Sequence, residues 1–256
     1  MLTRISLMIA GALFCIQTSA QNHFNDNQIA GRNVPDSAAV NSDFKKVLLN
    51  TMQGKKFDLI NGREYFPYYY RSELKPILFL EKQVTASIVF SGRNYDNIVL
   101  QYDTFTDEVI FSDLKNEFNL GQYKISLKRD EISRFILYFD DDTLDFWFLS
   151  GSSTPGFNLE DGFYEKAYCG ESEFIIKHRS VIHERNGIDE YFYTPVWYVN
   201  SGGNYHGFRS SKQFTAIFDA RQDEMKKLIG QKGINIRKAG KGQIISILRQ
   251  FDSSGE

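Results

Sequence analysis

The sequence has 256 residues, of which 42% are hydrophobic and 15% aromatic, and its formal net charge is −2. This length and composition supply enough apolar material for one sizeable core. The small net charge provides no overall field to attract nucleic acid or anionic lipid, so we expect no nucleic-acid partner. After the first twenty residues no segment approaches the roughly 20 apolar residues that span a bilayer, so we expect no transmembrane segment.

Residues 1–20 have the pattern of a secretory signal peptide. Arg4 precedes an apolar stretch, and Thr18 to Ala20 supply small residues at the two positions that a signal peptidase reads. The pattern predicts cleavage before Gln21 and export to the periplasm, the outer membrane or the exterior. A lipoprotein signal at Cys15 is the alternative, but bulky Phe14 stands where lipidation requires a small residue.

The remaining chain divides into three parts by its apolar pattern. Residues 21–43 are polar and have no apolar period, which predicts a flexible leader. Residues 44–209 carry alternating apolar runs with turn signals at short spacing, which predicts a mainly β fold, an antiparallel barrel or sandwich. In residues 210–256 the period changes to that of helix faces, which predicts a small α-helical C-terminal unit.

The clearest β pattern lies in residues 84–112. Apolar side chains alternate with polar ones in two runs separated by the turn signal of residues 91–94. This pattern predicts a three-stranded antiparallel meander with one buried face. The residues expected on that face are Val84, Ala86, Ile88, Phe90, Ile98, Leu100 and Tyr102.

Further strands are expected along the rest of the β region. Residues 122–128 alternate and place Ile125 on an apolar face, and residues 135–139 and 144–148 form a hairpin around the turn 140–143. Additional strands are predicted near residues 163–169, 173–179, 191–199 and 204–208.

Part of the meander resembles a motif found in a protein family. The motif reads Gly92-Arg93-x-Tyr95-x-Asn97-Ile98-x-Leu100-x-Tyr102-Asp103, followed by Asp107-Glu108-Val109-Ile110. It resembles uncharacterised secreted proteins of Bacteroidetes-type bacteria, from about Gly62 to a Lys-rich helical tail at residues 223–229. The resemblance implies an exported β-rich protein with a helical tail, and it carries over no catalytic residue.

One local match points to nucleic acid. Gly230-Gln231-Lys232-Gly233 has the spacing of the GXXG loop with which KH domains clamp a nucleic-acid backbone. A KH fold continues into a sustained helix, whereas Gly240 and Gly242 interrupt the pattern here. The alternative, a helix that ends at a glycine, is favoured.

Two groups of residues are of types that can bind a metal ion. His178 and His183 lack the HExxH spacing and fall on opposite faces of one extended strand. Asp140, Asp141, Asp142 and Asp145 lack the spacing of a calcium loop and suit a solvated hairpin turn. We therefore expect no metal and no cofactor.

The chain offers one pairing of a nucleophile with a base, Cys169 with His178 or His183. A cysteine in an alternating strand is more typical of a small buried hydrophobe, and no Gly-x-Ser-x-Gly elbow is present. We therefore predict no catalytic residue.

Aromatic residues are the candidates for ligand binding. Tyr68, Tyr69, Tyr70, Trp147 and Trp197 can form a sugar platform or line a cavity, although half-buried strands use the same residue types. The sequence therefore predicts a non-enzymatic module that binds an envelope protein or a small apolar or sugar ligand. The alternative is a hydrolase-type enzyme with a cleft in the β domain.

Overall fold

The computed structural model describes residues 58–66, 76–78, 84–113, 124–139, 142–151, 159–185 and 187–254. All of them belong to one of the two units of the chain, Lys46–Glu256. The predicted signal peptide and leader, residues 1–20 and 21–43, lie outside the described residues, as do Tyr68, Tyr69 and Tyr70.

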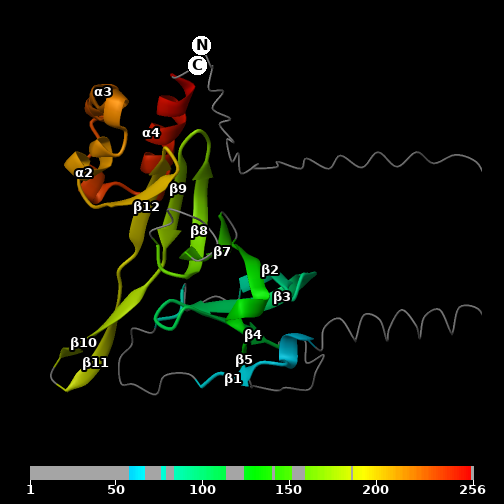
Figure 1. The fold of residues 1–256 in the computed structure, drawn as a ribbon. Coiled ribbons are helices and arrows are strands. Elements are labelled where there is room, and N and C mark those ends of the chain that lie inside the picture. The colour runs from blue at the N-terminus through cyan, green and yellow to red at the C-terminus, as the bar shows by residue number, and fades with distance from the viewer. Residues whose placement is uncertain are drawn as a thin grey trace, which may run out of the picture. The chain divides into compact units, whose positions relative to one another are not determined.

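The described residues form an antiparallel sheet of 11 strands, a separate two-stranded ribbon and a C-terminal group of helices (Figure 1). The order in the large sheet is β1-β5-β4-β3-β2-β6-β7-β8-β9-β12-β13, with β10 and β11 forming the ribbon. The predicted mainly β class with a small helical C-terminal unit is confirmed. The sheet is not closed into a barrel, so the barrel alternative is wrong.

The strands of the large sheet are β1 (Arg63–Glu64), β2 (Val84–Phe90), β3 (Arg93–Asp103), β4 (Glu108–Ser112), β5 (Lys124–Ser126), β6 (Ile132–Tyr138), β7 (Thr143–Leu149), β8 (Gly162–Cys169), β9 (Glu173–Lys177), β12 (Val196–Ser201) and β13 (Asn204–Phe208). The ribbon consists of β10 (Ser180–Arg185) and β11 (Ile188–Tyr193). The α-helices are α2 (Ser211–Ala216), α3 (Gln222–Lys232) and α4 (Lys241–Ser253), and the short 3-10 helices are η1 (Asp58–Ile60), η2 (Arg129–Glu131), η4 (Asp219–Arg221) and η5 (Ile236–Lys238).

The meander of β2, β3 and β4 agrees with the prediction for residues 84–112. The β2–β3 turn consists of Ser91 and Gly92, whose φ angles of 48° and 72° suit a two-residue hairpin loop. All side chains predicted on the inner face are buried, and Leu100 is fully buried. Local alternation and turn chemistry are therefore sufficient to form this part of the sheet.

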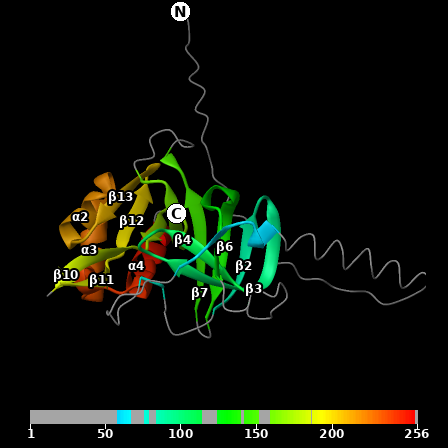
Figure 2. The same ribbon diagram turned by 90° about the horizontal axis from the view of Figure 1, so that it is seen from below.

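The first hydrophobic core lies inside the part of the sheet that curves from β5 to β8 (Figure 2). The rings of Phe135 and Phe146 stack 4.5 Å apart, and Tyr102 packs against both. Ile125 belongs to the same core, as predicted. The predicted hairpin of β6 and β7 supplies the stacked pair, since Phe135 and Phe146 are directly opposite each other in its register.

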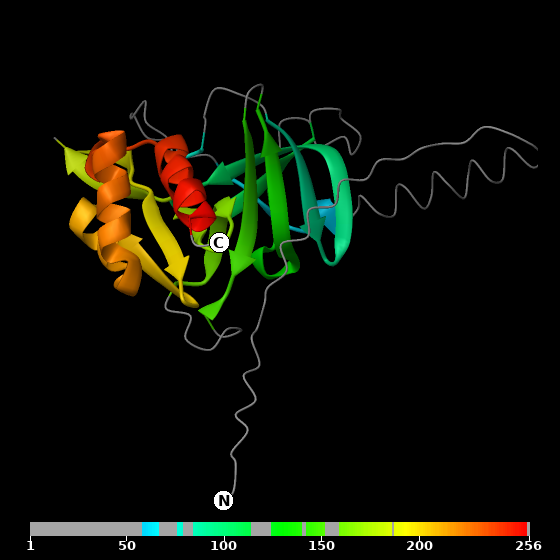
Figure 3. The same ribbon diagram turned by 90° about the horizontal axis from the view of Figure 1, so that it is seen from above.

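The second core lies between the helices and strands β8, β9, β12 and β13 (Figure 3). Ser210 caps the start of α2 by accepting a hydrogen bond from the Gln213 backbone N–H. Helix α3 ends at Gly233, which has a left-handed φ of 61°. Gly230 therefore lies within a helix and not in a clamp loop, which contradicts the KH alternative and confirms the glycine-terminated helix.

The ribbon of β10 and β11 extends beyond the large sheet (yellow in Figure 1). No strand was predicted at β10, and the single strand predicted over residues 191–199 is two strands separated at Thr194 and Pro195. Pro195 has no N–H to donate, so it suits an interruption in pairing. The ribbon leaves Ile182, Phe192 and Tyr193 exposed. Because it has little buried face, its sequence lacks the regular apolar alternation that identifies other strands.

We predict that Leu100→Ala lowers the free energy of unfolding by about 2–5 kcal/mol, because the side chain is fully buried in the first core. Chemical denaturation measures the change. Thr85→Ala, at an exposed position of β2, is the control and should stay within about 0.5 kcal/mol. A Leu100→Ala loss as small as that of the control would contradict the packing described here.

Candidate ligand-binding pocket

An open pocket of about 670 Å³ lies where the β3–β4 turn meets β8, β9 and β10. Its lining combines apolar and aromatic side chains with several charged ones. The apolar and aromatic residues are Phe105, Leu159, Tyr164, Val181, Ile182, Val196 and Tyr198, and the charged residues are Asp107, Arg129, Glu160, Asp161, Lys177 and Arg179. A concave site with a mixed lining of this kind is typical of small-molecule binding.

The β3–β4 turn is built by its own polar residues. The Asp103 carboxylate accepts hydrogen bonds from the backbone N–H groups of Phe105 and Thr106, at 2.8 and 3.1 Å. Asp107 follows with a left-handed φ of 59°, a conformation that Asp tolerates better than most residues. The turn therefore presents Phe105 and Asp107 in a fixed arrangement.

Hydrogen bonds fasten this turn to the start of β10. The Ser180 backbone N–H donates to the Thr104 carbonyl at 3.0 Å, and the two hydroxyls lie 2.7 Å apart. On its other side Thr104 donates to the Pro76 carbonyl from both its N–H and its hydroxyl. These buried bonds fix one wall of the pocket.

Asp107 is the centre of an ion cluster at the base of the pocket. Its carboxylate lies 2.8 Å from Lys177 Nζ and 2.8 Å from the Arg129 guanidinium, and it accepts a hydrogen bond from Tyr102. The Asp107 and Lys177 side chains are only 15% and 12% exposed. Burial lowers the pKa of Lys177, and this effect exceeds the opposing attraction of Asp107. Asp107 and Lys177 thus form a mostly buried ion pair, which the more exposed Arg129 joins.

Tyr198 is a half-buried aromatic residue of the pocket, and the fully buried Tyr164 packs against it. The Tyr164 hydroxyl donates to the Glu160 carbonyl at 2.8 Å, and its ring lies 6.1 Å from that of Tyr198 in an edge-on arrangement. Lys177 Nζ lies 5.0 Å from the centre of the Tyr164 ring. Burial raises the pKa of both tyrosine hydroxyls, and the nearby Glu160 charge adds to the effect. Both hydroxyls therefore remain protonated at neutral pH.

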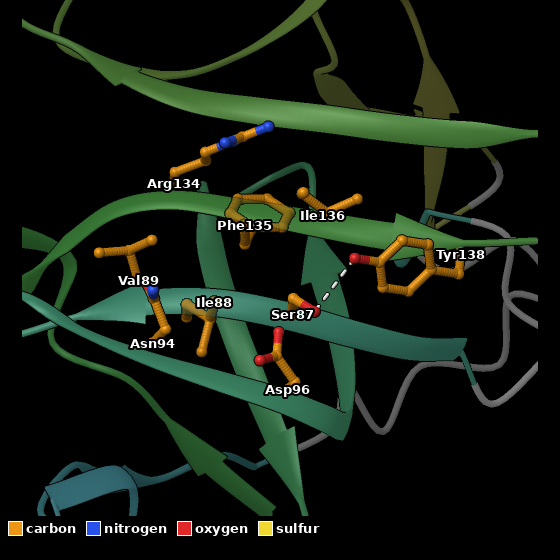
Figure 4. A pocket seen from close by; sticks show the side chains of 9 residues that line it. All are labelled: Ser87, Ile88, Val89, Asn94, Asp96, Arg134, Phe135, Ile136 and Tyr138. Atoms are coloured by element: carbon orange, nitrogen blue, oxygen red, sulfur yellow. Dashed lines mark hydrogen bonds between the residues drawn. The ribbon is translucent and has the colours of Figure 1, made fainter. Parts of the chain in front are cut away.

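A second, smaller hollow of about 180 Å³ lies on the outer surface of β2, β3 and β6 (Figure 4). The Tyr138 hydroxyl donates to Ser87 there at 3.1 Å. Arg134 makes a bidentate pair with Asp145 at 2.8 and 2.9 Å. Three of its polar side chains are thus already bonded, and its volume is much smaller, so the pocket beside β10 is the stronger candidate.

The structure does not bring the predicted aromatic residues together. Trp147 lies on the outer surface between Arg134 and Lys166, whose cationic groups are 4.8 and 4.3 Å from its ring centre. Trp197 belongs to the second core under the helices, where it contacts Phe174 and Phe208. Neither tryptophan lines the pocket beside β10.

The pocket uses Tyr164 and Tyr198, which were not among the predicted site residues. The register aligns Tyr198 with Ile175 and Tyr164 with Trp147. Both tyrosines belong to a small cluster with Ile175 on the sheet face opposite the helices. Period-two alternation around Trp197 places Tyr198 on the opposite face from Trp197, and that signal was available in the sequence.

The structure shows where Cys169, His178 and His183 lie, the three candidates for a nucleophile with a base or for metal ligands. Cys169 is exposed at the end of β8, so the expectation that it is a buried hydrophobe is wrong. Its Sγ lies 3.9 Å from Glu173 Oε1. His178 is buried and bonded at both ring nitrogens, whereas His183 is exposed on β10 beside Phe192. Among the described residues, no group of three or more His, Cys, Asp or Glu side chains is arranged to hold a metal ion.

A chain of polar residues outside the pocket lining has the buried pair His178 and Glu165 at its centre. His178 Nε2 lies 2.7 Å from Glu165, and Nδ1 lies 2.6 Å from the Tyr193 hydroxyl at the end of the ribbon. Lys241, the first residue of α4, donates to Glu165 at 3.0 Å. Burial alone would raise the pKa of Glu165, but its bonds to His178 and Lys241 outweigh burial and lower the pKa. This chain connects ribbon, sheet and helix.

No helix in the described part of the chain is long and apolar enough to cross a membrane. No family model matches the chain, and the comparisons with curated proteins and with solved structures found no match either.

We predict that Asp107→Asn lowers the free energy of unfolding by about 3 kcal/mol, because Lys177 loses its counter-ion in a mostly buried position. Asparagine tolerates the left-handed backbone, so the turn itself should persist. In the double variant with Lys177→Met the loss should be smaller, as measured by chemical denaturation. Asp223→Asn, which breaks an exposed pair with Lys226, is the control and should have little effect. An equal loss with and without Lys177→Met would contradict the ion-pair explanation.

Glu165→Gln should reduce stability more at pH 7 than at pH 3. The pKa of Glu165 is lower in the folded than in the unfolded protein, so its stabilising effect is complete above the ordinary glutamate pKa and is lost as pH falls through the lowered value. The difference in unfolding free energy between wild type and variant should therefore shrink with acidification. Glu184→Gln, at an exposed position of β10, is the control. A difference that stays constant from pH 7 to pH 3 would contradict the assigned role of Glu165.

Proposed function

We propose that this chain is an exported, non-enzymatic ligand-binding protein of the cell envelope, and that its ligand occupies the pocket beside β10. The observation that carries the proposal is the pocket itself. Its volume of about 670 Å³ falls within the range of about 300–1,000 Å³ typical of small-molecule sites. The half-buried Tyr198 ring provides aromatic surface, and the fully buried Tyr164 ring packs edge-on against it.

The arrangement of charges favours binding over hydrolysis. The Asp107 carboxylate is engaged by Lys177, Arg129 and Tyr102, so it is a poor general base. The Lys177 ammonium is held by Asp107 and by the Phe163 carbonyl. These groups therefore stabilise the walls of a preformed site, which is the requirement of a binding module.

Export to the envelope rests on the sequence. A charged start, an apolar run and small residues before Gln21 occur in the order of a secretory signal. The resemblance to secreted proteins of Bacteroidetes-type bacteria supports the same location and remains a prediction.

The proposal predicts that a panel of amino acids, short peptides, sugars and small apolar compounds contains a ligand that raises the melting temperature of the mature protein. Tyr198→Ala should lower the affinity for that ligand about tenfold, equivalent to about 1.4 kcal/mol, because it removes a half-buried aromatic ring from the pocket. Calorimetric titration measures the affinity.

Tyr138→Ala removes an exposed tyrosine from the smaller hollow and is the matched control, which should bind as wild type does. A ligand that binds Tyr198→Ala as tightly as wild type would place its site elsewhere. Conversion of the bound ligand to a product would instead establish the hydrolase alternative.

A further inference from the structure

Four of the six charged residues that line the pocket are committed to internal bonds. Asp107, Lys177 and Arg129 form the ion cluster. The Asp161 carboxylate accepts a hydrogen bond from the Gly151 N–H at 2.8 Å, and its carbonyl accepts one from Arg129. The three charges of the ion cluster are therefore paired internally, and the Asp161 carboxylate already has a hydrogen-bond donor.

The other two, Arg179 and Glu160, carry opposite charges. Within the described part of the chain, neither side chain has a hydrogen bond or an ion pair, and both are exposed to the pocket. Their backbones are nevertheless fixed. The Arg179 carbonyl accepts from the Thr194 N–H at 2.8 Å, and the Glu160 carbonyl accepts from the Tyr164 hydroxyl at 2.8 Å. Arg179 and Glu160 are thus oppositely charged side chains without a counter-ion among the described residues, and the backbone of each is hydrogen-bonded at the edge of the pocket.

Both charges are close enough to Tyr198 to act on its hydroxyl. Burial and the negative charge of Glu160 raise the pKa of Tyr198, and the positive charges of Arg179 and of Arg209, which is outside the pocket lining, oppose them. Tyr198 lines the same pocket, with Tyr164 beside it. The two uncommitted charges therefore share an aromatic surface.

We propose that the pocket binds a short peptide with free termini, whose carboxylate pairs with Arg179 and whose ammonium pairs with Glu160. Arg suits this role because its guanidinium binds a carboxylate with two parallel hydrogen bonds. The half-buried Tyr198 ring and the exposed Phe105 and Ile182 contact the apolar side chains between the termini. This inference rests on the proposed function and specifies its ligand.

The charge pattern discriminates against other ligands. An anionic or cationic ligand would satisfy one of the two side chains and desolvate the other without a partner. A neutral sugar would satisfy neither charge fully. A ligand that carries both charges is the class in which Arg179 and Glu160 both obtain a counter-ion.

The test is calorimetric titration of the mature protein with the tripeptide alanyl-phenylalanyl-alanine. Parallel titrations use its N-acetylated form, its C-amidated form, free phenylalanine and the neutral disaccharide maltose. The unblocked tripeptide should bind at least about tenfold more tightly than any other probe, because each charged contact contributes about 1.4 kcal/mol or more.

Two variants test which side chain binds each terminus of the peptide. Arg179→Gln should bind the free and the amidated peptides equally, and Glu160→Gln should bind the free and the acetylated peptides equally. Arg237→Gln and Glu184→Gln are the matched controls, since both residues are exposed and neither lines the pocket. The controls should retain the wild-type preference for free termini.

The remaining outcomes overturn the inference in distinguishable ways. Maltose or a blocked peptide that binds as tightly as the free tripeptide would refute the charge-pairing argument and leave a ligand-binding pocket in place. Equal affinity for free phenylalanine would assign an amino acid instead of a peptide. Failure of all five probes would refute the peptide assignment, and only failure of the wider panel would also refute the proposed function.

Discussion

The contact between the β3–β4 turn and strands β8 to β10 is the constraint on which the rest of the structure depends. Asp107 is 70 residues from Lys177 in the sequence, yet the two side chains meet at 2.8 Å. Thr104 and Ser180 join the same two parts of the chain through backbone and hydroxyl bonds. With this contact formed, the strands from β3 to β8 curve around the first core, although the sheet stays open.

One sheet serves two purposes through its two faces. Strands β9 and β12 direct Phe174, Ile176 and Val199 into the core under the helices. The alternate residues Ile175 and Tyr198 belong to the cluster on the opposite face. Helices that cover only one face leave the other available for a ligand. The helical unit therefore stabilises the strands that carry the pocket without occupying it.

The ribbon of β10 and β11 forms one wall of the pocket and is bonded to the rest of the structure at its base. A two-stranded ribbon has little stability by itself. Its base is secured where Tyr193 meets His178, which continues through Glu165 to Lys241 of α4. Arg179 and Ser180, which line the pocket, lie at this hydrogen-bonded base.

The sequence by itself determined the local elements. Alternation in residues 84–112 specified the strands and the burial of Leu100, the Ser91–Gly92 pair specified the turn, and Gly233 specified the end of α3. These features depend on neighbours within a few residues, where periodicity and backbone preference act directly.

Contacts between residues that are distant in the sequence were decided only by the tertiary structure. It left the sheet open, ended a continuous-looking strand at Thr194 and Pro195, and separated Trp147 from Trp197 on opposite faces. It also paired Asp107 with Lys177 and left Arg179 and Glu160 without partners in the described residues. Charged side chains have no period that reveals their partners, because an ion pair depends on distance in space and not on spacing along the chain.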